Sequence, residues 1–163
     1  VATLRLGATT PSFDLEHPID ATYPTSHIDR ALVETTLKQF IGDIMQVPPA
    51  FSACKVGGRR AYEMARKGEE VPLKAKLLRI DEIELLDASL IGEAPTITLR
   101  IVCSKGTYIR ALARDIGLAL GSGAHLTALR RTQVGDVRVE DCHRLDDFEQ
   151  WLAQQTIETE LPQ

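Results

Sequence analysis

The sequence predicts a single α/β domain of the α+β type, on three observations. Residues 97–103 carry an apolar side chain at every second position, which is the period-2 pattern of a half-buried strand. Residues 109–120 then place apolar side chains three and four positions apart, as on the buried face of a helix. Finally, 163 residues with 44% hydrophobic content are enough to bury one core.

The other elements follow from similar local patterns. Before the strand at residues 97–103, which we call the central strand, we expect a strand over residues 1–6, a long irregular loop over 8–25 and a helix over 27–40 capped by Ser26 or Thr25. A strand over residues 51–56, a short helix over 59–67 and a strand over 77–86 are expected to follow. After the helix at residues 109–120, which we call the central helix, we expect a last strand over residues 134–139 and a closing helix over 145–152. Pro48 and Pro49 end any helix before them, because proline lacks a backbone donor and pushes its neighbour to extended geometry.

Charge is distributed unevenly along the chain. The net charge is −4, which by itself argues against a nucleic-acid binder. Residues 46–139, however, carry fifteen basic and ten acidic residues, whereas residues 1–45 carry three and six, and residues 140–163 carry one and seven. A basic centre between acidic ends is compatible with a face that contacts phosphates, although such charges are more often merely solvated.

The cysteines and histidines do not indicate a metal site. Cys54, Cys103 and Cys142 are far apart and form no CxxC pair, so we interpret them as buried, reduced thiols. His125 is interpreted as a structural hydrogen-bonding residue, because no nucleophile lies beside it. No apolar run reaches the length of about 18 residues that a membrane span needs, and no charged-then-apolar leader is visible. We therefore expect no membrane association.

The turn between the central strand and helix, residues 104–107 (SKGT), precedes an unusual cation. Gly106 suits the bend and Thr107 is the expected N-cap. Arg110 falls in the first helical turn, where the macrodipole disfavours a positive charge by up to about 1 kcal/mol. Lys105 adds to the same positive cluster. Either Arg110 is simply solvated, or the turn is built to hold a carboxylate or a phosphate.

Tyr62 lies on the flank of the short helix, on the side shared with Arg59 and Arg66 and after a strand that carries Lys55. A tyrosine among cations suits stacking on a nucleobase while the cations meet phosphates. The alternative is a tyrosine that covers the edge of the core, with the arginines in water.

Three separated motifs resemble those of the TruB family of tRNA pseudouridine synthases. They are residues 46–49 (QVPP) with 52–55 (SACK) and 58–63 (GRRAYE), residues 103–110 (CSKGTYIR), and residues 123–126 (GAHL) with 129–132 (LRRT). Their order and spacing also fit, and the resemblance extends from residue 1 to about residue 146. Three motifs in register are a more specific signal than one glycine pattern.

The resemblance implies the pseudouridine synthase catalytic-domain fold, a mixed, mainly antiparallel sheet flanked by helices. It implies a cytoplasmic isomerase that flips uridine 55 out of the tRNA T-loop and converts it to pseudouridine without a metal or organic cofactor. Arg110 and Tyr62 become the catalytic candidates: Arg110 would pair with the nucleophilic aspartate, and Tyr62 would stack on the flipped base. The candidates for binding the tRNA T-arm are Tyr108 and Leu129, which would line the pocket, and the cations Lys55, Arg59, Arg66, Lys105, Arg130 and Arg131.

One family motif is missing from these residues. The nucleophilic aspartate of the family lies in a motif of the type GxLDPxAxGxL, which does not occur here, and Asp14, Glu16 and Asp20 in FDLEHPID do not match it. We therefore expect residues 1–153 to be the C-terminal part of the catalytic domain, truncated on its N-terminal side, followed by a frayed tail over 154–163 and no PUA domain. Such a chain would be inactive alone. It would expose residues 1–6 as a sheet edge through which it could self-associate.

Two other functions remain open at this point. The chain could be a non-catalytic RNA-binding module of the same fold. Alternatively, residues 104–107 could form a small-molecule phosphate loop in an α/β enzyme, although SKGT lacks the spaced glycines of a P-loop.

Overall fold

The computed structural model describes residues 1–69 and 71–155, without the side chains of residues 55 and 56. It divides the chain into two compact units, the first over Val1–Arg130 and the second from Arg131 onward. None of the described residues after Arg130 is buried. The expected domain over residues 1–153 stays a prediction. Most of the expected tail, residues 156–163, lies outside the described residues.

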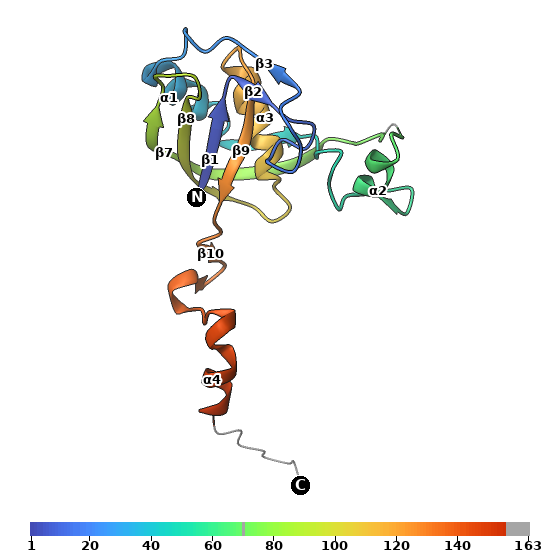
Figure 1. The fold of residues 1–163 in the computed structure, drawn as a ribbon, viewed down its shortest axis with the longest axis vertical. Helices are drawn as coiled ribbons and strands as arrows, with labels where there is room; N and C mark the ends of the chain where they lie inside the picture. Colours follow the sequence, from blue (N-terminus) through green and yellow to red (C-terminus); the bar gives the residue numbers. More distant parts are fainter. Residues whose placement is uncertain (70, 156–163) are drawn as a thin grey trace. The chain divides into compact units, whose positions relative to one another are not determined.

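The first unit is built on a five-stranded sheet with the strand order β4-β7-β8-β1-β9 (Figure 1). These strands are β1 (Ala2–Leu6), β4 (Gly42–Gln46), β7 (Lys76–Ser89), β8 (Thr96–Cys103) and β9 (Ala124–Leu129). Every neighbouring pair in this sheet runs antiparallel. The predicted α+β fold with a mainly antiparallel sheet is thereby confirmed.

The first strand does not lie at an edge of this sheet. β1 pairs with β8 on one side and with β9 on the other, with Leu4 opposite Ile97 and Leu126. The prediction that residues 1–6 form an exposed edge is wrong, because the alternating pattern of β1 shows that one face is buried but not how many neighbours the strand has. The outer strands are β4 and β9, and the backbone N–H of Leu126 in β9 donates to the carbonyl of Phe13. Self-association through residues 1–6 thus loses its structural basis.

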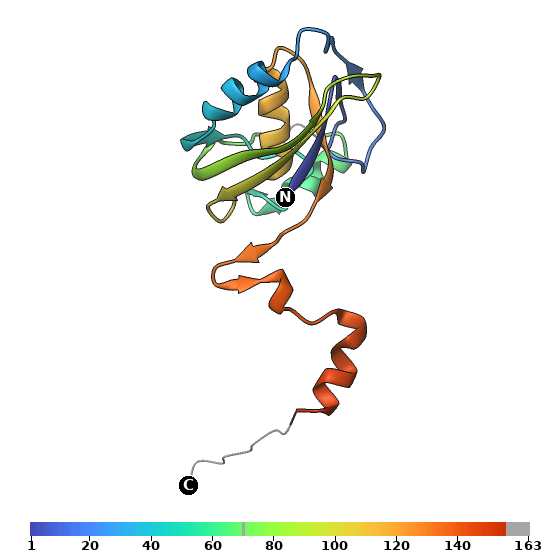
Figure 2. The same ribbon diagram turned by 90° about the vertical axis from the view of Figure 1, so that its left-hand side faces the viewer.

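Two helices, α1 (Arg30–Lys38) and α3 (Ile109–Ala119), cover one face of the sheet (Figure 2). Val33 and Leu37 of α1 and Leu112 and Ile116 of α3 join the inward-facing strand residues in one core cluster. The N-cap of α1 is Asp29, whose carboxylate accepts from the N–H of Leu32, and not the expected Ser26 or Thr25.

Helix α3 begins at Ile109, with Tyr108 as its N-cap residue. The expected cap, Thr107, lies one position too early and its hydroxyl donates to Ser104 O instead. At the other end, α3 approaches β9 very closely: a Cβ on Gly117 would lie 2.4 Å from the backbone nitrogen of Ala124. Only glycine permits this contact, which fixes α3 against the sheet.

The opposite face of the sheet carries charges. Arg100 contacts Glu82 and Glu84, and Arg79 contacts Asp43 and Asp81. All of these side chains are at least 42% exposed, so each pair contributes little to the free energy of unfolding.

The remaining elements of the first unit are short. β2 (Ala8–Thr9) pairs with β3 (Ala21–Thr22), so the expected irregular loop over residues 8–25 contains a small hairpin. β5 (Lys55–Val56) pairs with β6 (Arg59–Arg60), which leads into α2 (Ala61–Arg66). The strand expected over residues 51–56 is limited to its last two residues.

The second unit contains a hairpin of β10 (Gln133–Val134) and β11 (Val137–Arg138), the 3₁₀ helices η1 (Val139–Asp141) and η2 (Leu145–Asp147), and helix α4 (Phe148–Ala153). The expected single strand over residues 134–139 is interrupted because Gly135 adopts a φ of +57° and turns the chain back. No helix in the described part of the chain is long and apolar enough to span a membrane.

The three cysteines are free, but they are less buried than expected. Cys54 and Cys103 are half-buried and Cys142 is exposed. Across residues 1–69 and 71–155, no three His, Cys, Asp or Glu side chains are grouped so that they could hold a metal ion. His125 is buried, and its Nδ1 lies 2.8 Å from the carbonyl oxygen of Ala8, as expected of a structural residue.

Candidate active site

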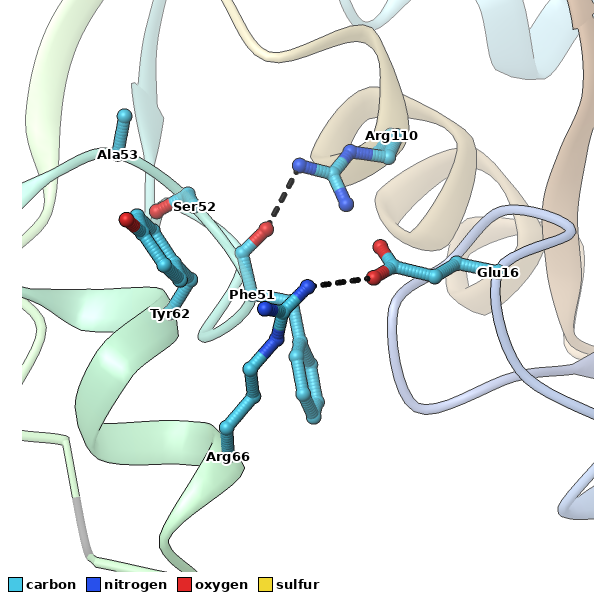
Figure 3. Close-up of a pocket in the computed structure, with 7 residues that line it drawn as sticks. All are labelled: Glu16, Phe51, Ser52, Ala53, Tyr62, Arg66 and Arg110. Carbon is cyan, nitrogen blue, oxygen red and sulfur yellow. Dashed lines mark hydrogen bonds and ion pairs between the residues drawn. The ribbon is translucent and has the colours of Figure 1, made fainter.

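A cavity of about 260 Å³ lies where the start of α3, the segment before β5, helix α2 and the loop after β2 meet (Figure 3). Its lining residues are Glu16, Phe51, Ser52, Ala53, Tyr62, Arg66 and Arg110. The cavity is slightly smaller than typical small-molecule sites of about 300–1,000 Å³, so it suits one ring-sized group. Both catalytic candidates, Arg110 and Tyr62, border it.

Arg110 is fixed by acceptors from two separate segments of the chain. Its Nη1 donates to Ser12 O at 3.2 Å and to Asp14 Oδ2 at 3.0 Å, and its Nη2 donates to Phe51 O at 2.8 Å. The side chain is 22% exposed. Asp14 therefore compensates the unfavourable position of this cation in the first turn of α3. The prediction that Arg110 is paired with an acid was made for an aspartate outside these residues, and in this structure the partner is Asp14.

Asp14 itself is held in its charged form. Burial opposes ionisation of this carboxyl group, but hydrogen bonds from the Ser12 hydroxyl, the Glu16 N–H and the Arg110 guanidinium outweigh it. Together they lower the pKa of Asp14 below its ordinary value. Asp14 does not line the cavity, so it acts on the cavity through Arg110.

The wall beside Arg110 is formed by residues 51–53. The Ser52 N–H donates to Ala50 O at 2.9 Å, and Ser52 O accepts from the Tyr62 N–H at 2.9 Å, which ties this segment to the start of α2. The ring of His17 packs against Phe51, with centroids 4.5 Å apart. The wall is thus supported from both α2 and the loop that carries Asp14.

Arg66 faces the cavity from α2 in a more open setting. Its Nη2 lies 3.3 Å from Glu16 Oε1, and its guanidinium lies 5.5 Å from the centroid of the Tyr62 ring. The Arg66 side chain is 65% exposed and that of Glu16 is 48% exposed. Arg66 and Glu16 therefore form a solvent-accessible ion pair at the rim of the cavity (Figure 3).

The other candidate residues do not line this cavity. Arg59 is exposed and makes a bidentate pair with Glu69 at 2.9 Å. Tyr108 is half-buried, and its backbone N–H and C=O are both bound by the side chain of Gln46. Lys105 is exposed in the turn before α3, and Leu129 and Arg130 are exposed at the end of the first unit. Lys55 lies in β5, and Arg131 begins the second unit.

Sequence reasoning did not select five residues of this site: Asp14, Glu16, Phe51, Ser52 and Ala53. Asp14 and Glu16 were weighed only as the family nucleophile, which they do not match. A usable signal did exist: a cation at a helix start requires a nearby anion, and FDLEHPID carries three acids. Nothing in the sequence pattern indicated that Phe51 and Ser52 would form a wall, since they resembled the start of a strand.

The sequence also matches two family profiles. The sequence matches the family profile "TruB family pseudouridylate synthase (N terminal domain)" over residues 1–109. It matches "tRNA pseudouridylate synthase B C-terminal domain" over residues 110–163.

Two curated relatives are named tRNA pseudouridine synthase B. The protein from Bacteroides thetaiotaomicron is 71% identical over 160 residues, which cover 98% of this chain and 67% of the relative. The protein from Phocaeicola vulgatus is 69% identical over 158 residues, which cover 97% and 66%. The chain thus spans about two thirds of the length of these relatives.

Solved structures show the same fold. A chain of a Cbf5-Nop10-Gar1 complex superposes with a TM-score of 0.55 at 25% identity, over 85% of this chain and 30% of that chain. A chain of an H/ACA RNP bound to a substrate RNA containing 2'-deoxyuridine gives a TM-score of 0.51 at 23% identity, over 85% and 28%.

Proposed function

This chain belongs to the TruB family of pseudouridine synthases, and from that membership we propose that the protein converts uridine 55 in the T-arm of tRNA to pseudouridine. The observation that supports this most directly is the fixed guanidinium of Arg110 at a cavity bordered by Tyr62. The same two residues lie in the motifs that resemble the family. We further propose that the protein works in the cytoplasm.

The reaction is an isomerisation in which no atom is gained from outside except a proton from water. The N1–C1′ bond of the uridine breaks, a C5–C1′ bond forms, and the proton on C5 leaves to solvent while N1 gains one. The base must leave the RNA stack for this chemistry, and a cavity suited to one ring is the kind of site that receives it. Neither a metal nor an organic cofactor is needed in this scheme.

We assign the following roles to the residues of the site. Arg110 presents a fixed positive charge to the acid nucleophile and to the charge that develops during bond cleavage. Tyr62 stacks on the flipped base, and Arg66 contacts a phosphate next to it. We place the nucleophilic aspartate outside these 163 residues, because the GxLDPxAxGxL motif does not occur among them.

The residues outside the cavity are proposed to bind the T-arm around the flipped nucleotide. Tyr108, before α3, and Leu129, at the end of β9, contact the RNA beside the flipped nucleotide, and the cations meet backbone phosphates. These cations are Lys55, Arg59, Lys105, Arg130 and Arg131. The exposure of Arg59, Lys105, Arg130 and Arg131 supports such a role, because phosphate contacts need accessible charge.

The test is a tritium-release assay on a T-arm stem-loop RNA labelled at C5 of the target uridine. We expect release by the intact protein and none by the 163-residue chain, which should still bind the RNA. Turnover by the 163-residue chain would place the nucleophile among its own acids. Absence of turnover by the intact protein, with RNA binding retained, would favour the alternative of a non-catalytic RNA-binding module.

Binding has its own test. Replacing Arg59 and Arg66 by Glu should weaken RNA binding and reduce its dependence on salt concentration, since each lost phosphate contact lowers the salt slope by about 0.7–0.9. Binding that persists unchanged in this double variant would count against an RNA role for this face of the chain.

A further inference from the structure

The hydroxyl group of Ser52, at the cavity, has no hydrogen-bond partner. Ser52 is 3% exposed, and its Oγ is buried without a hydrogen-bond partner. Across the described residues, the only other such side-chain atom is Nε of Arg5, which lies on β1 and does not line the cavity. Buried hydroxyl groups are normally satisfied, so this one requires an explanation.

The backbone around Ser52 leaves little freedom. Its own N–H and C=O bind Ala50 O and the Tyr62 N–H, both at 2.9 Å. The preceding carbonyl, Phe51 O, accepts from Arg110 at 2.8 Å. Ser52 and Tyr62 both line the cavity (Figure 3). The main chain is therefore fixed between the two catalytic candidates while the hydroxyl is unused.

An alanine at this position would have almost the same shape and would bury no unpaired polar group. The serine thus reduces the stability of the ligand-free protein, because a buried hydroxyl without a partner has lost its hydrogen bonds to water. This loss of stability is explained if a bound ligand supplies the hydrogen-bond partner that the Ser52 hydroxyl lacks. A serine hydroxyl can both donate and accept, and it turns into the cavity by rotation about one bond between staggered positions.

We propose that the Ser52 hydroxyl hydrogen-bonds to the flipped nucleoside and positions it between Tyr62 and Arg110. This inference rests on the proposed function, because it names a further contact in the same site. The chemistry of the partner is a neutral hydrogen-bonding group of the nucleoside, either the polar edge of the uracil ring or the ribose 2′-hydroxyl. An anionic phosphate is the weaker match, since Arg66 and Arg110 already supply charge to this cavity.

The experiment compares Ser52→Ala with Ser122→Ala in the intact protein. Ser122 is the matched control: it is 4% exposed, but its hydroxyl donates to Pro24 O at 2.8 Å. We expect S52A to unfold at the same or a higher temperature than the wild type and to lose roughly tenfold in kcat/KM, the worth of about one hydrogen bond. S122A should unfold at a lower temperature and keep the kcat/KM of the wild type.

Two results would overturn the inference. One is an S52A protein with the kcat/KM of the wild type. The other is an S52A protein that is destabilised as much as S122A, which would mean that the hydroxyl has a structural partner in the folded protein. A wild-type protein that fails to isomerise uridine would instead overturn the proposed function, so the two failures are distinguishable.

A second substrate identifies the partner group. RNA with 2′-deoxyuridine at the target position removes the ribose hydroxyl. If Ser52 binds that hydroxyl, the wild type should react more slowly with the deoxy substrate than with the normal substrate. S52A should then react with both substrates at the same rate, because its contact is already absent. If Ser52 binds the uracil edge, the wild type and S52A should lose the same factor on the deoxy substrate.

Discussion

Arg110 and Arg66 border the same cavity but differ in how they are held. Arg110 is 22% exposed and donates to three acceptors, from the loop after β2 and from the wall at Phe51. Arg66 is 65% exposed and has one carboxylate partner, Glu16, at 3.3 Å. The first cation is therefore in place before any ligand binds, whereas the second can exchange its carboxylate for another anion. This difference separates a residue that shapes the site from one that recruits a ligand.

The largest effect is expected from Arg110→Lys. A lysine keeps the charge but cannot bind Asp14, Ser12 O and Phe51 O together, because it lacks the planar fork of donors. We expect kcat/KM to fall by about 100-fold or more, as when a fixed donor is removed from other active sites. Tritium release under single-turnover conditions measures the effect.

The control for this variant is Arg114→Lys, one helical turn further along α3. Arg114 is similarly buried, with 19% exposure, and it donates to Asp115 and to Val47 O. It does not line the cavity. R114K should lose stability comparable to R110K and retain its activity. Equal losses of activity in both variants would show that packing of α3, and not the guanidinium at the cavity, is what matters.

The next effect concerns Asp14→Asn, which removes the charge that holds Arg110. The amide keeps the shape of the side chain, so we expect a smaller loss in kcat/KM than for R110K, about tenfold, because Ser12 O and Phe51 O still accept from Arg110. An activity equal to that of the wild type would contradict the view that Asp14 positions Arg110.

The lowered pKa of Asp14 predicts how the stability of the protein depends on pH. Its pKa is lowered in the folded protein, so its contribution to stability is fully present above the ordinary pKa of aspartate, about 3.9. That contribution is lost as the pH falls through the lowered pKa, because protonation then breaks the pair with Arg110. Between about pH 5 and pH 2, the stability of the wild type should decline more steeply than that of D14N, as followed by urea unfolding.

The central part of the fold was predictable because its signals are local. The alternation in residues 97–103 and the helical spacing in residues 109–120 correspond to β8 and α3. The order of the strands in the sheet was not predictable. The sequence of β1 has the pattern of a half-buried strand whether the strand lies at an edge or, as here, between β8 and β9. Local alternation was also an uncertain guide to burial after Arg130, because none of the described residues there is buried.

The same distinction applies to the site. Arg110 and Tyr62 could be selected from the sequence, because a cation at a helix start and a tyrosine among arginines are local patterns. Their roles remain proposals. Asp14 and Ser52 lie 96 and 58 residues away from Arg110 along the chain, and only the tertiary fold brings them together. No periodicity carries that information, which is why long-range partners were missed.

A smaller effect is expected from Glu16→Gln, which tests whether Arg66 is exchangeable. Removing the carboxylate frees Arg66 for a phosphate, so we expect RNA affinity to increase by a few fold at low salt, the scale of one exposed ion pair. The matched control is Glu34→Gln, in an exposed pair with Arg30 where Glu34 is 49% exposed, and it should leave affinity unchanged. Weaker binding by E16Q would mean that Glu16 positions Arg66 and does not compete with RNA for it.

The smallest effect is expected at an arginine that has two carboxylate partners but does not border the cavity. Arg100 bridges Glu82 and Glu84 on the open face of the sheet and is 42% exposed. Because water and salt screen these charges, Glu84→Gln should change the free energy of unfolding by less than about 1 kcal/mol and leave activity intact. A larger loss in urea unfolding would show that this face is covered in the intact protein. Arg100 would then be fixed by its partners as Arg110 is. The exposed fraction of an arginine side chain in this structure would no longer distinguish fixed arginines from weakly paired ones.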